Sequence, residues 1–324
     1  MSILNTIKDP IRQELDAFEH TFQHSLKTEI PLLNLIIKYL IRRKGKQIRP
    51  ILVFLSAKIS GSIGPSTYIA ASMIEIMHTA SLIHDDIVDE SYERRNYFSI
   101  NALWKSKIAV LFGDYLLAQG LLLSVKNREY ECLQIVSDAV KEMSEGELMQ
   151  IQLSRKLSIT EDQYFEIIRK KTATLISACT ASGARSVHAT EQVVELMAGF
   201  GEKLGIAFQI RDDLIDYQLS SHAGKPSGND IKEKKLTLPL IYAIQKSNTQ
   251  EKRRVLSLIN KGKSDSGGLS EIVQFINVKG GIDYSIKKMN EYRDEAIKIL
   301  DFFPDSITKQ SLRELSFYIT SRRK

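Results

Sequence analysis

The sequence predicts an all-α fold built from long helices, and three observations support this prediction. No proline occurs between Pro65 and Pro226, and glycine is sparse over the same interval. Apolar residues recur at steps of three and four, whereas strands would require alternation. The 324 residues are 43% hydrophobic and 26% charged, which is enough apolar mass for a sizeable core. These features exclude collagen-like, low-complexity and wholly disordered chains.

Three segments are expected to be helices. The first, 69–87, has apolar residues at helical spacing, and the third, 196–207, repeats that pattern. The second, 108–125, resembles a membrane span, but Asp114 and Gln119 interrupt it. We therefore expect a buried core helix there.

Four polar, glycine-rich segments are expected to be loops: 60–65, 220–235, 261–268 and 279–281. Helical periodicity resumes soon after each of them, so none has the character of an interdomain linker. We therefore expect a single domain over residues 1–324, a bundle of long helices.

Charge and cysteine content limit the location and the partners. Residues 1–19 contain scattered charged side chains, among them Lys8, Asp9, Arg12, Glu14 and Asp16, and do not resemble a signal peptide. Cys132 and Cys179 are too few for a disulfide framework, so a reducing cytoplasm is expected. The net charge of +6 leaves nucleic acid, a membrane surface and an anionic substrate open.

Two copies of Asp-Asp-x-x-Asp are the first functional signal. On a helix, positions i and i+4 share a face, so each copy gathers three carboxylates at one end of an apolar segment. Their mutual repulsion is unfavourable, and divalent cations would relieve it. Magnesium is commonly held by one or two carboxylates together with substrate phosphates. The two copies therefore predict a Mg²⁺ site for a diphosphate, formed by Asp85, Asp86, Asp89, Asp212, Asp213 and Asp216.

Lysine and arginine side chains near these motifs could take up the remaining phosphate charge. Each of them alone would more often be a surface cation, but several follow closely on the acidic motifs. The candidates are Lys46, Arg49, Arg94, Arg95, Lys171, Lys225 and Lys235.

With these motifs the chain resembles the trans-prenyltransferase, or polyprenyl diphosphate synthase, family over most of its length. The matching segments occur in the family's order. They are Gly45-Lys46, 78–86, Arg94-Arg95, 113–116, 146–148, 171–173, 209–216 and 235–239.

The resemblance implies an all-α bundle around a deep central cavity, usually in a homodimer. It implies that the six aspartates bind Mg²⁺ and, through it, an allylic diphosphate (dimethylallyl, geranyl or farnesyl). Four cations would contact that diphosphate: Arg94, Lys171, Lys225 and Lys235. Isopentenyl diphosphate would be held by Lys46, Arg49, His78 and Arg95. Thr172 and Gln209, with Lys171, would face the reacting carbons.

The implied reaction is a head-to-tail condensation that releases pyrophosphate. The allylic cation is attacked by the double bond of isopentenyl diphosphate, and we assign the lost proton to the departing pyrophosphate. Three glycines usual in the family are replaced, by Lys44, Asn96 and Lys234. These replacements affect the backbone contacts of those loops and leave the charged side chains in place.

Ala80 and Ser81, just before the first motif, are small. In this family small residues there are typical of long-chain enzymes, since a Phe or Tyr would block the growing product. We expect a product of about C30 to C50, one isoprene unit being about as long as a 5.4 Å helical turn. Such products are typically quinone side chains in this family. The alternatives are a short-chain farnesyl or geranylgeranyl diphosphate synthase and a regulatory subunit of a heteromeric synthase.

Other classes fit the sequence less well. An HD-type phosphohydrolase needs more histidine ligands than His84 supplies, and a ferritin-like protein needs a second Glu-x-x-His besides 75–78. A terpene cyclase would not need cations for a second diphosphate. Nucleic acid is not expected, because aromatics are not interleaved with the basic runs. Peripheral contact with a membrane remains a hypothesis for the positive charge.

Overall fold

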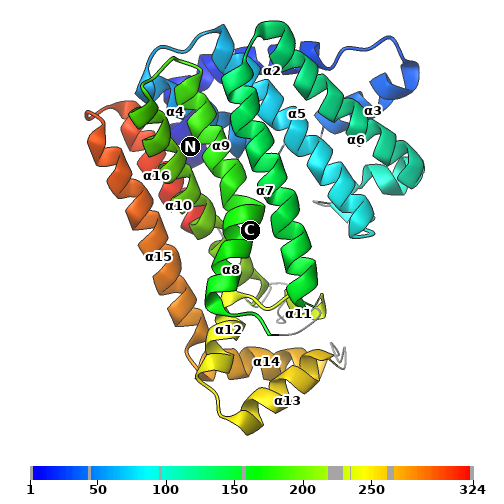
Figure 1. The fold of residues 1–324 in the computed structure, drawn as a ribbon, viewed down its shortest axis with the longest axis vertical. Helices are drawn as coiled ribbons and strands as arrows, with labels where there is room; N and C mark the ends of the chain where they lie inside the picture. The colour runs from blue at the N-terminus through cyan, green and yellow to red at the C-terminus, as the bar shows by residue number, and fades with distance from the viewer. Residues whose placement is uncertain are drawn as a thin grey trace. The chain divides into compact units, whose positions relative to one another are not determined.

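The computed structural model describes residues 3–42, 45–94, 97–154, 158–217, 229–233, 235–260 and 266–321. These residues are helical almost throughout (Figure 1). The strands among them form one antiparallel ribbon, β1 (Glu93–Arg94) with β2 (Tyr97–Phe98). The predicted all-α class is therefore confirmed.

The described residues group into two compact units, and each is considered by itself. The first comprises residues 1–137, 178–197 and 306–312, and the second 138–177, 198–305 and 313–324. The single domain over 1–324 stays a prediction.

The first unit begins with seven consecutive helical elements. They are α1 (Ile3–Lys8), the 3₁₀ turn η1 (Asp9–Ile11), α2 (Arg12–Ser25), α3 (Pro31–Ile41), α4 (Ile48–Ser60), α5 (Pro65–Val88) and α6 (Ile100–Asn127). Four helices contribute residues to both units: α7 (Tyr130–Ser154), α9 (Thr174–Arg185), α10 (Glu191–Asp216) and α16 (Ile307–Ser321).

The second unit contains the remaining elements. They are α8 (Glu161–Ile168), the π-helical turn η2 (Arg169–Ala173), α11 (Asn229–Lys232), α12 (Leu238–Gln245), α13 (Thr249–Asn260), α14 (Ser266–Val278), α15 (Gly281–Ile299) and the 3₁₀ turn η3 (Leu300–Phe302). The core around the end of α10 includes Ile206, Ile210 and Leu214, all buried. This packing fixes the helix end that carries the second acidic motif.

Helices α5 and α6 lie side by side in the first unit (Figure 1). Their close approach depends on small residues of α6. A Cβ on Gly113 would lie 2.2 Å from the His84 ring, and one on Gly120 would lie 2.7 Å from Met77 Cγ. Ile76, Ala80 and other apolar residues of α5 are buried in the resulting core.

The helix expected over 108–125 is present within α6, but the expectation that it is buried is only partly right. Leu111 and Leu122 are 59% and 47% exposed, and about a third of the helix's most apolar window is buried. Among the described residues α6 is the one helix long and apolar enough to cross a membrane. Its inner face packs on α5, and its outer face remains apolar and uncovered in this chain.

The two expected helices 69–87 and 196–207 lie within α5 and α10. The loops expected at 60–65 and 279–281 are confirmed in outline, with α5 starting at Pro65 and Gly280 at φ +75°. Most of 220–235 and 261–268 lies outside the described residues. The loop prediction is wrong for 229–232, which form α11, and from residue 266, where α14 begins.

Candidate functional site

Both acidic motifs lie at the C-terminal end of a helix. Asp85 and Asp86 occupy the last turn of α5, and Asp89 is its C-cap residue. The second motif forms the last turn of α10, which ends at Asp216. Backbone carbonyls give a helix C-terminus a partial negative charge of about −0.5, so carboxylates there are unfavourable unless a cation is bound.

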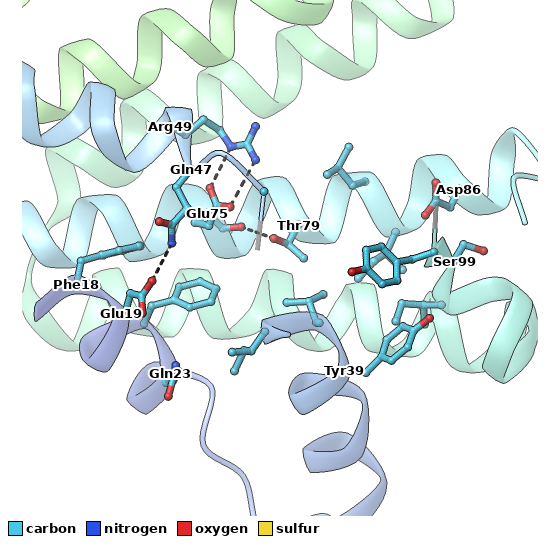
Figure 2. A pocket seen from close by; sticks show the side chains of 18 residues that line it. Phe18, Glu19, Gln23, Tyr39, Gln47, Arg49, Glu75, Thr79, Asp86 and Ser99 are labelled. Atoms are coloured by element: carbon cyan, nitrogen blue, oxygen red, sulfur yellow. Dashed lines mark hydrogen bonds and ion pairs between the residues drawn. The ribbon is translucent and has the colours of Figure 1, made fainter. Parts of the chain in front are cut away.

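In the first unit, Asp86 lines a pocket of about 380 Å³ (Figure 2). Its side chain is only 5% exposed, whereas Asp89 is exposed. The pocket also has apolar walls, which include Phe18, Phe22 and Ile83. This arrangement suits a ligand with a charged end and an apolar end.

Arg49 from α4 lines the same pocket and is held by Glu75 of α5. The Arg49 Nε donates to Glu75 Oε2 at 3.0 Å, and Nη2 donates to Oε1 at 3.5 Å. Both side chains are about one-fifth exposed. The two hydrogen bonds fix the plane of the guanidinium, which a single-point contact would not do.

In the second unit, Asp213 is buried and hydrogen-bonded on both oxygens. The Tyr164 hydroxyl donates to Oδ2 at 2.7 Å, and Gln209 Nε2 donates to Oδ1 at 2.8 Å. Burial, and after it the negative charge of Asp230, raises the pKa of Asp213 to about 8. Without a cation, this carboxyl therefore holds its proton near neutral pH.

Asp230, from α11, lies beside the same motif. Its backbone N–H donates to Asp216 Oδ2 at 3.0 Å. Burial, and after it the charge of Asp216, raises the pKa of Asp230 to about 6. Buried carboxyls with raised pKa values are typical of functional sites, and Asp213 and Asp230 bring two of them to this end of α10.

Thr172 and Lys171 reach this region from the π-helical turn η2. The Thr172 hydroxyl donates to Gln209 Oε1 at 2.7 Å, so a chain of hydrogen bonds runs from Thr172 through Gln209 to Asp213. Lys171 Nζ forms an ion pair with Glu147 at 2.5 Å.

A pocket of about 100 Å³ brings five predicted residues of the second unit together: Lys171, Thr172, Gln209, Asp213 and Lys235. Of the residues predicted in the first unit, Arg49 and Asp86 share one pocket, whereas Lys46 and His78 are described but do not line it. Arg95 and Lys225 lie outside the described residues, as does the side chain of Arg94, whose backbone belongs to β1.

Sequence reasoning missed three polar residues that contact the predicted ones, namely Glu75, Tyr164 and Asp230. Glu75 belongs to the single Glu-x-x-His copy at 75–78, which predicts no contact with Arg49. Asp230 lies in a segment that had been expected to form a loop, and Tyr164 is separated from Asp213 by 49 positions. Helical spacing around Arg49 and Asp213 could not have identified these partners, because each lies on another helix.

The donor set fits a hard divalent cation. The motifs offer carboxylate oxygens at two negative helix ends, and burial has raised the pKa of Asp213. Within the described ranges, no three His, Cys, Asp or Glu side chains converge closely enough to hold a metal by themselves. Phosphate oxygens of a substrate would therefore have to complete the coordination, as is common for Mg²⁺.

Comparison with known proteins decides the family. A family model described as polyprenyl synthetase matches residues 30–276. The chain belongs to the polyprenyl synthetase family. It is 33% identical to an all-trans-nonaprenyl-diphosphate synthase (geranyl-diphosphate specific) of Rhodobacter capsulatus, covering 95% of this chain and 94% of that protein. It is 30% identical to an octaprenyl diphosphate synthase of Haemophilus influenzae, covering 98% and 96%.

Solved structures of this family share the fold. A decaprenyl diphosphate synthase from Rhodobacter capsulatus gives a TM-score of 0.93 at 33% identity, with 99% of both chains covered. A polyprenyl synthase from Caulobacter crescentus, complexed with calcium and isoprenyl diphosphate, gives 0.91 at 29% identity over 99% and 98%. A geranylgeranyl pyrophosphate synthase from Bacteroides thetaiotaomicron gives 0.84 at 35% identity over 99% and 100%.

The predicted family and enzyme class, a trans-prenyltransferase with the all-α isoprenoid synthase fold, are therefore confirmed. Isoprenyl diphosphates are the substrates of this family, and its enzymes depend on a divalent metal. The roles of the individual site residues stay predictions.

Proposed function

We propose that this polyprenyl synthetase couples isopentenyl diphosphate head to tail with an allylic diphosphate and builds a long-chain all-trans polyprenyl diphosphate, for a quinone side chain. The observation that carries the proposal is the pocket of the second unit, where Lys171, Thr172, Gln209 and Lys235 lie with Asp213. The sequence similarity to octaprenyl and nonaprenyl diphosphate synthases supports the long product.

The charged residues of the two units have complementary roles in this proposal. Lys171 and Lys235 stabilise the diphosphate of the allylic substrate, and Arg49 binds isopentenyl diphosphate through its guanidinium. The six aspartates would hold Mg²⁺, which would supply Lewis-acid stabilisation of the negative charge on the departing group.

The proposed reaction needs no base from the protein. The allylic C–O bond breaks and pyrophosphate leaves, after which the double bond of isopentenyl diphosphate attacks the allylic carbon. One proton is lost as the new double bond forms, and pyrophosphate accepts it. Thr172 and Gln209, hydrogen-bonded at 2.7 Å, present polar oxygens that stabilise the positive charge.

The direct test is to incubate the purified chain with Mg²⁺, labelled isopentenyl diphosphate and farnesyl diphosphate, and then to size the dephosphorylated products. We expect products of about C30 to C50 and no elongation when EDTA replaces Mg²⁺. Absence of any elongation by the wild-type chain would refute the proposal and favour a regulatory subunit. A C20 product would favour the short-chain alternative, represented by the similarity to a geranylgeranyl pyrophosphate synthase.

Product length is proposed to depend on Ser81. Ala80 is fully buried in the core between α5 and α6, whereas Ser81 on the next position of α5 is only partly buried. Ser81→Phe should shorten the product if the chain grows along this side of α5, and sizing the dephosphorylated products measures this. Ala80→Phe should instead destabilise the fold.

We further propose a homodimer formed through the exposed face of α6. Beyond a kink at Lys105, its apolar side chains share one side of the helix and are each 41–59% exposed: Val110, Leu111, Leu121, Leu122 and Val125. Light scattering should give a dimer for the wild type and a monomer for Leu111→Asp with Leu122→Asp. Ile307→Asp, at an exposed site on α16, should leave the dimer intact.

A cytoplasmic location and peripheral contact with anionic lipid complete the proposal. Cys132 and Cys179 are buried free thiols, and burial raises the pKa of each to about 12, which suits a protein that needs no disulfide. The excess of cations is compatible with a lipid surface that receives the apolar product.

A further inference from the structure

Lys171 and Thr172 lie in a π-helical turn, which is the unusual element of the second unit. The turn η2 (Arg169–Ala173) separates α8 from α9. A π turn holds more residues than an α turn and is less stable, so it persists where surrounding contacts favour it. The contacts that stabilise η2 therefore affect where the side chains of Lys171 and Thr172 lie.

Two glycines on neighbouring helices bring backbone against this turn. A Cβ on Gly146 of α7 would lie 2.8 Å from the backbone nitrogen of Lys171. A Cβ on Gly205 of α10 would lie 2.5 Å from the Cα of Ala173. Because the opposing atoms are backbone, neither position can accept a methyl group unless the turn moves.

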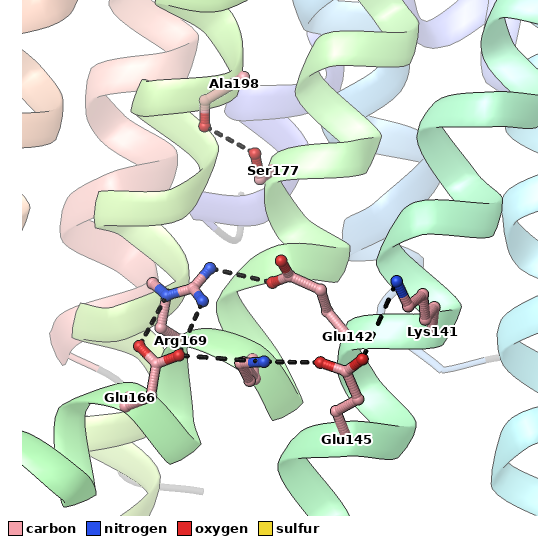
Figure 3. A network of polar contacts seen from close by, with 8 residues as sticks. Lys141, Glu142, Glu145, Glu166, Arg169, Ser177 and Ala198 are labelled. Carbon is pink, nitrogen blue, oxygen red and sulfur yellow. Dashed lines mark hydrogen bonds and ion pairs between the residues drawn. The ribbon is translucent and has the colours of Figure 1, made fainter.

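The first two residues of the turn are cations that are tied to acids on α7 and α8. Arg169 donates to Glu142 at 2.9 Å and makes two hydrogen bonds with Glu166, at 3.0 and 3.1 Å (Figure 3). Lys170 donates to Glu145 at 2.6 Å. Glu142, Glu145 and Gly146 share one face of α7, so this face contacts the turn and also neutralises the positive charge of its first two residues.

The ion pairs are too exposed to matter much for overall stability. The side chains of Glu142, Glu145 and Glu166 are 36–45% exposed, and ion pairs of this kind contribute about 0–1 kcal/mol each. All of these ion pairs nevertheless involve Arg169 or Lys170, which directly precede Lys171 and Thr172. A contribution to the orientation of the turn is therefore better supported than a contribution to folding.

We propose that the Glu142–Glu145–Gly146 face of α7 and the cations Arg169 and Lys170 hold the π turn in the register that directs Lys171 and Thr172 into the pocket. Arg169, Lys170, Glu142 and Glu145 are positioning residues in this scheme, since they act through the turn. The inference rests on the proposed function, because it gives the turn the task of presenting residues that act on substrate.

The test is a double-mutant cycle with Glu145→Gln and Lys170→Met, measured by steady-state elongation kinetics. Each single variant should lower kcat about tenfold and change the KM values for both diphosphates less than threefold. The double variant should be no slower than either single variant, because both remove the same contact. Gly146→Ala should lower kcat in the same way.

A matched control is the ion pair between Arg254 of α13 and Glu271 of α14, at 2.7 Å. Glu271→Gln should leave kcat unchanged. Circular dichroism and thermal melting should place Glu145→Gln, Lys170→Met and Glu271→Gln within a few degrees of the wild type, and Glu142→Gln replaces any variant that fails to fold. A wild-type chain without elongation would refute the proposed function. If the wild type is active but kcat is unchanged in Glu145→Gln and Gly146→Ala, this inference alone is refuted. Additive losses of kcat in the double-mutant cycle would also refute this inference alone.

Discussion

Asp213 illustrates how a residue can lower stability in order to serve a site. Its carboxyl is buried, and burial, followed by the charge of Asp230, raises its pKa to about 8. In the unfolded chain the group ionises near its ordinary value of 3.8. Metal-free folding therefore takes up a proton between about pH 4 and pH 8, so this residue's contribution to stability falls as pH rises through that window.

Replacing the carboxyl by an amide should remove this pH-dependent cost. Asp213→Asn should stabilise the EDTA-treated protein by about 1–3 kcal/mol at pH 7.5 and progressively less toward pH 5. The Tyr164 hydroxyl can turn to accept from the new amide. Denaturant unfolding across this pH range is the measurement, with Asp16→Asn as an exposed control. A gain in stability that does not depend on pH would contradict the raised pKa assigned to Asp213. Elongation activity should be lost in the variant.

Arg49 gives a second prediction at the scale of single residues. Arg49→Lys keeps the positive charge but cannot form the two-point contact with Glu75 at 3.0 and 3.5 Å. We expect the KM for isopentenyl diphosphate to rise about tenfold and the KM for the allylic substrate to stay unchanged. Lys58→Arg, at another ion pair on α4, is the matched control. An equal rise in both KM values would argue against a role in one subsite.

At the scale of elements, glycines determine how closely helices approach. A Cβ on Gly183 of α9 would lie 2.4 Å from the carbonyl oxygen of Val53 on α4. The opposing atom is backbone within a helix, so it cannot rotate away.

Gly183→Ala should therefore destabilise the protein by about 1–3 kcal/mol, because α4 or α9 must shift. The control is Gly64→Ala, where a Cβ would have nothing within 4 Å. Denaturant midpoints of the two variants provide the comparison. Equal stability of Gly183→Ala and wild type would mean that the helices can separate without loss of packing.

Elements were predicted from the sequence to different degrees. Apolar spacing identified the helices that became α5 and α10, because one face of each is buried. The same reasoning overestimated the burial of α6, since spacing and composition do not reveal whether an apolar face packs within one chain. The π turn at 169–173 was not foreseen, because its backbone depends on contacts with Gly146 and Gly205.

At the scale of the whole molecule, the sequence motifs predicted the family and the enzyme class, and the comparisons confirm both. Local sequence gives residue type and helical face, so Asp213, Gln209 and Thr172 could be named together. It does not give partners from other helices, and Tyr164 and Asp230 were therefore missed although both lie within the same pocket.

The net charge of +6 leads to the last prediction. The seven predicted site cations nearly cancel the six aspartates, so most of the surplus lies elsewhere. Part of it is a run on α13, where Lys252, Arg253 and Arg254 are all exposed. Each lysine or arginine near an anionic bilayer contributes about 1 kcal/mol of attraction at moderate salt.

Vesicles that contain anionic lipid should therefore bind the protein, and uncharged vesicles should not. Binding should weaken as salt shortens the distance over which charges interact, which is about 10 Å at 0.1 M. Lys252→Glu with Arg253→Glu should reduce co-sedimentation more than Lys287→Glu with Lys298→Glu, which makes the same charge change on α15. Equal losses would mean that net charge alone drives binding. Binding that ignored both salt and anionic lipid would exclude an electrostatic membrane contact, because the two kinds of vesicle differ in their charge.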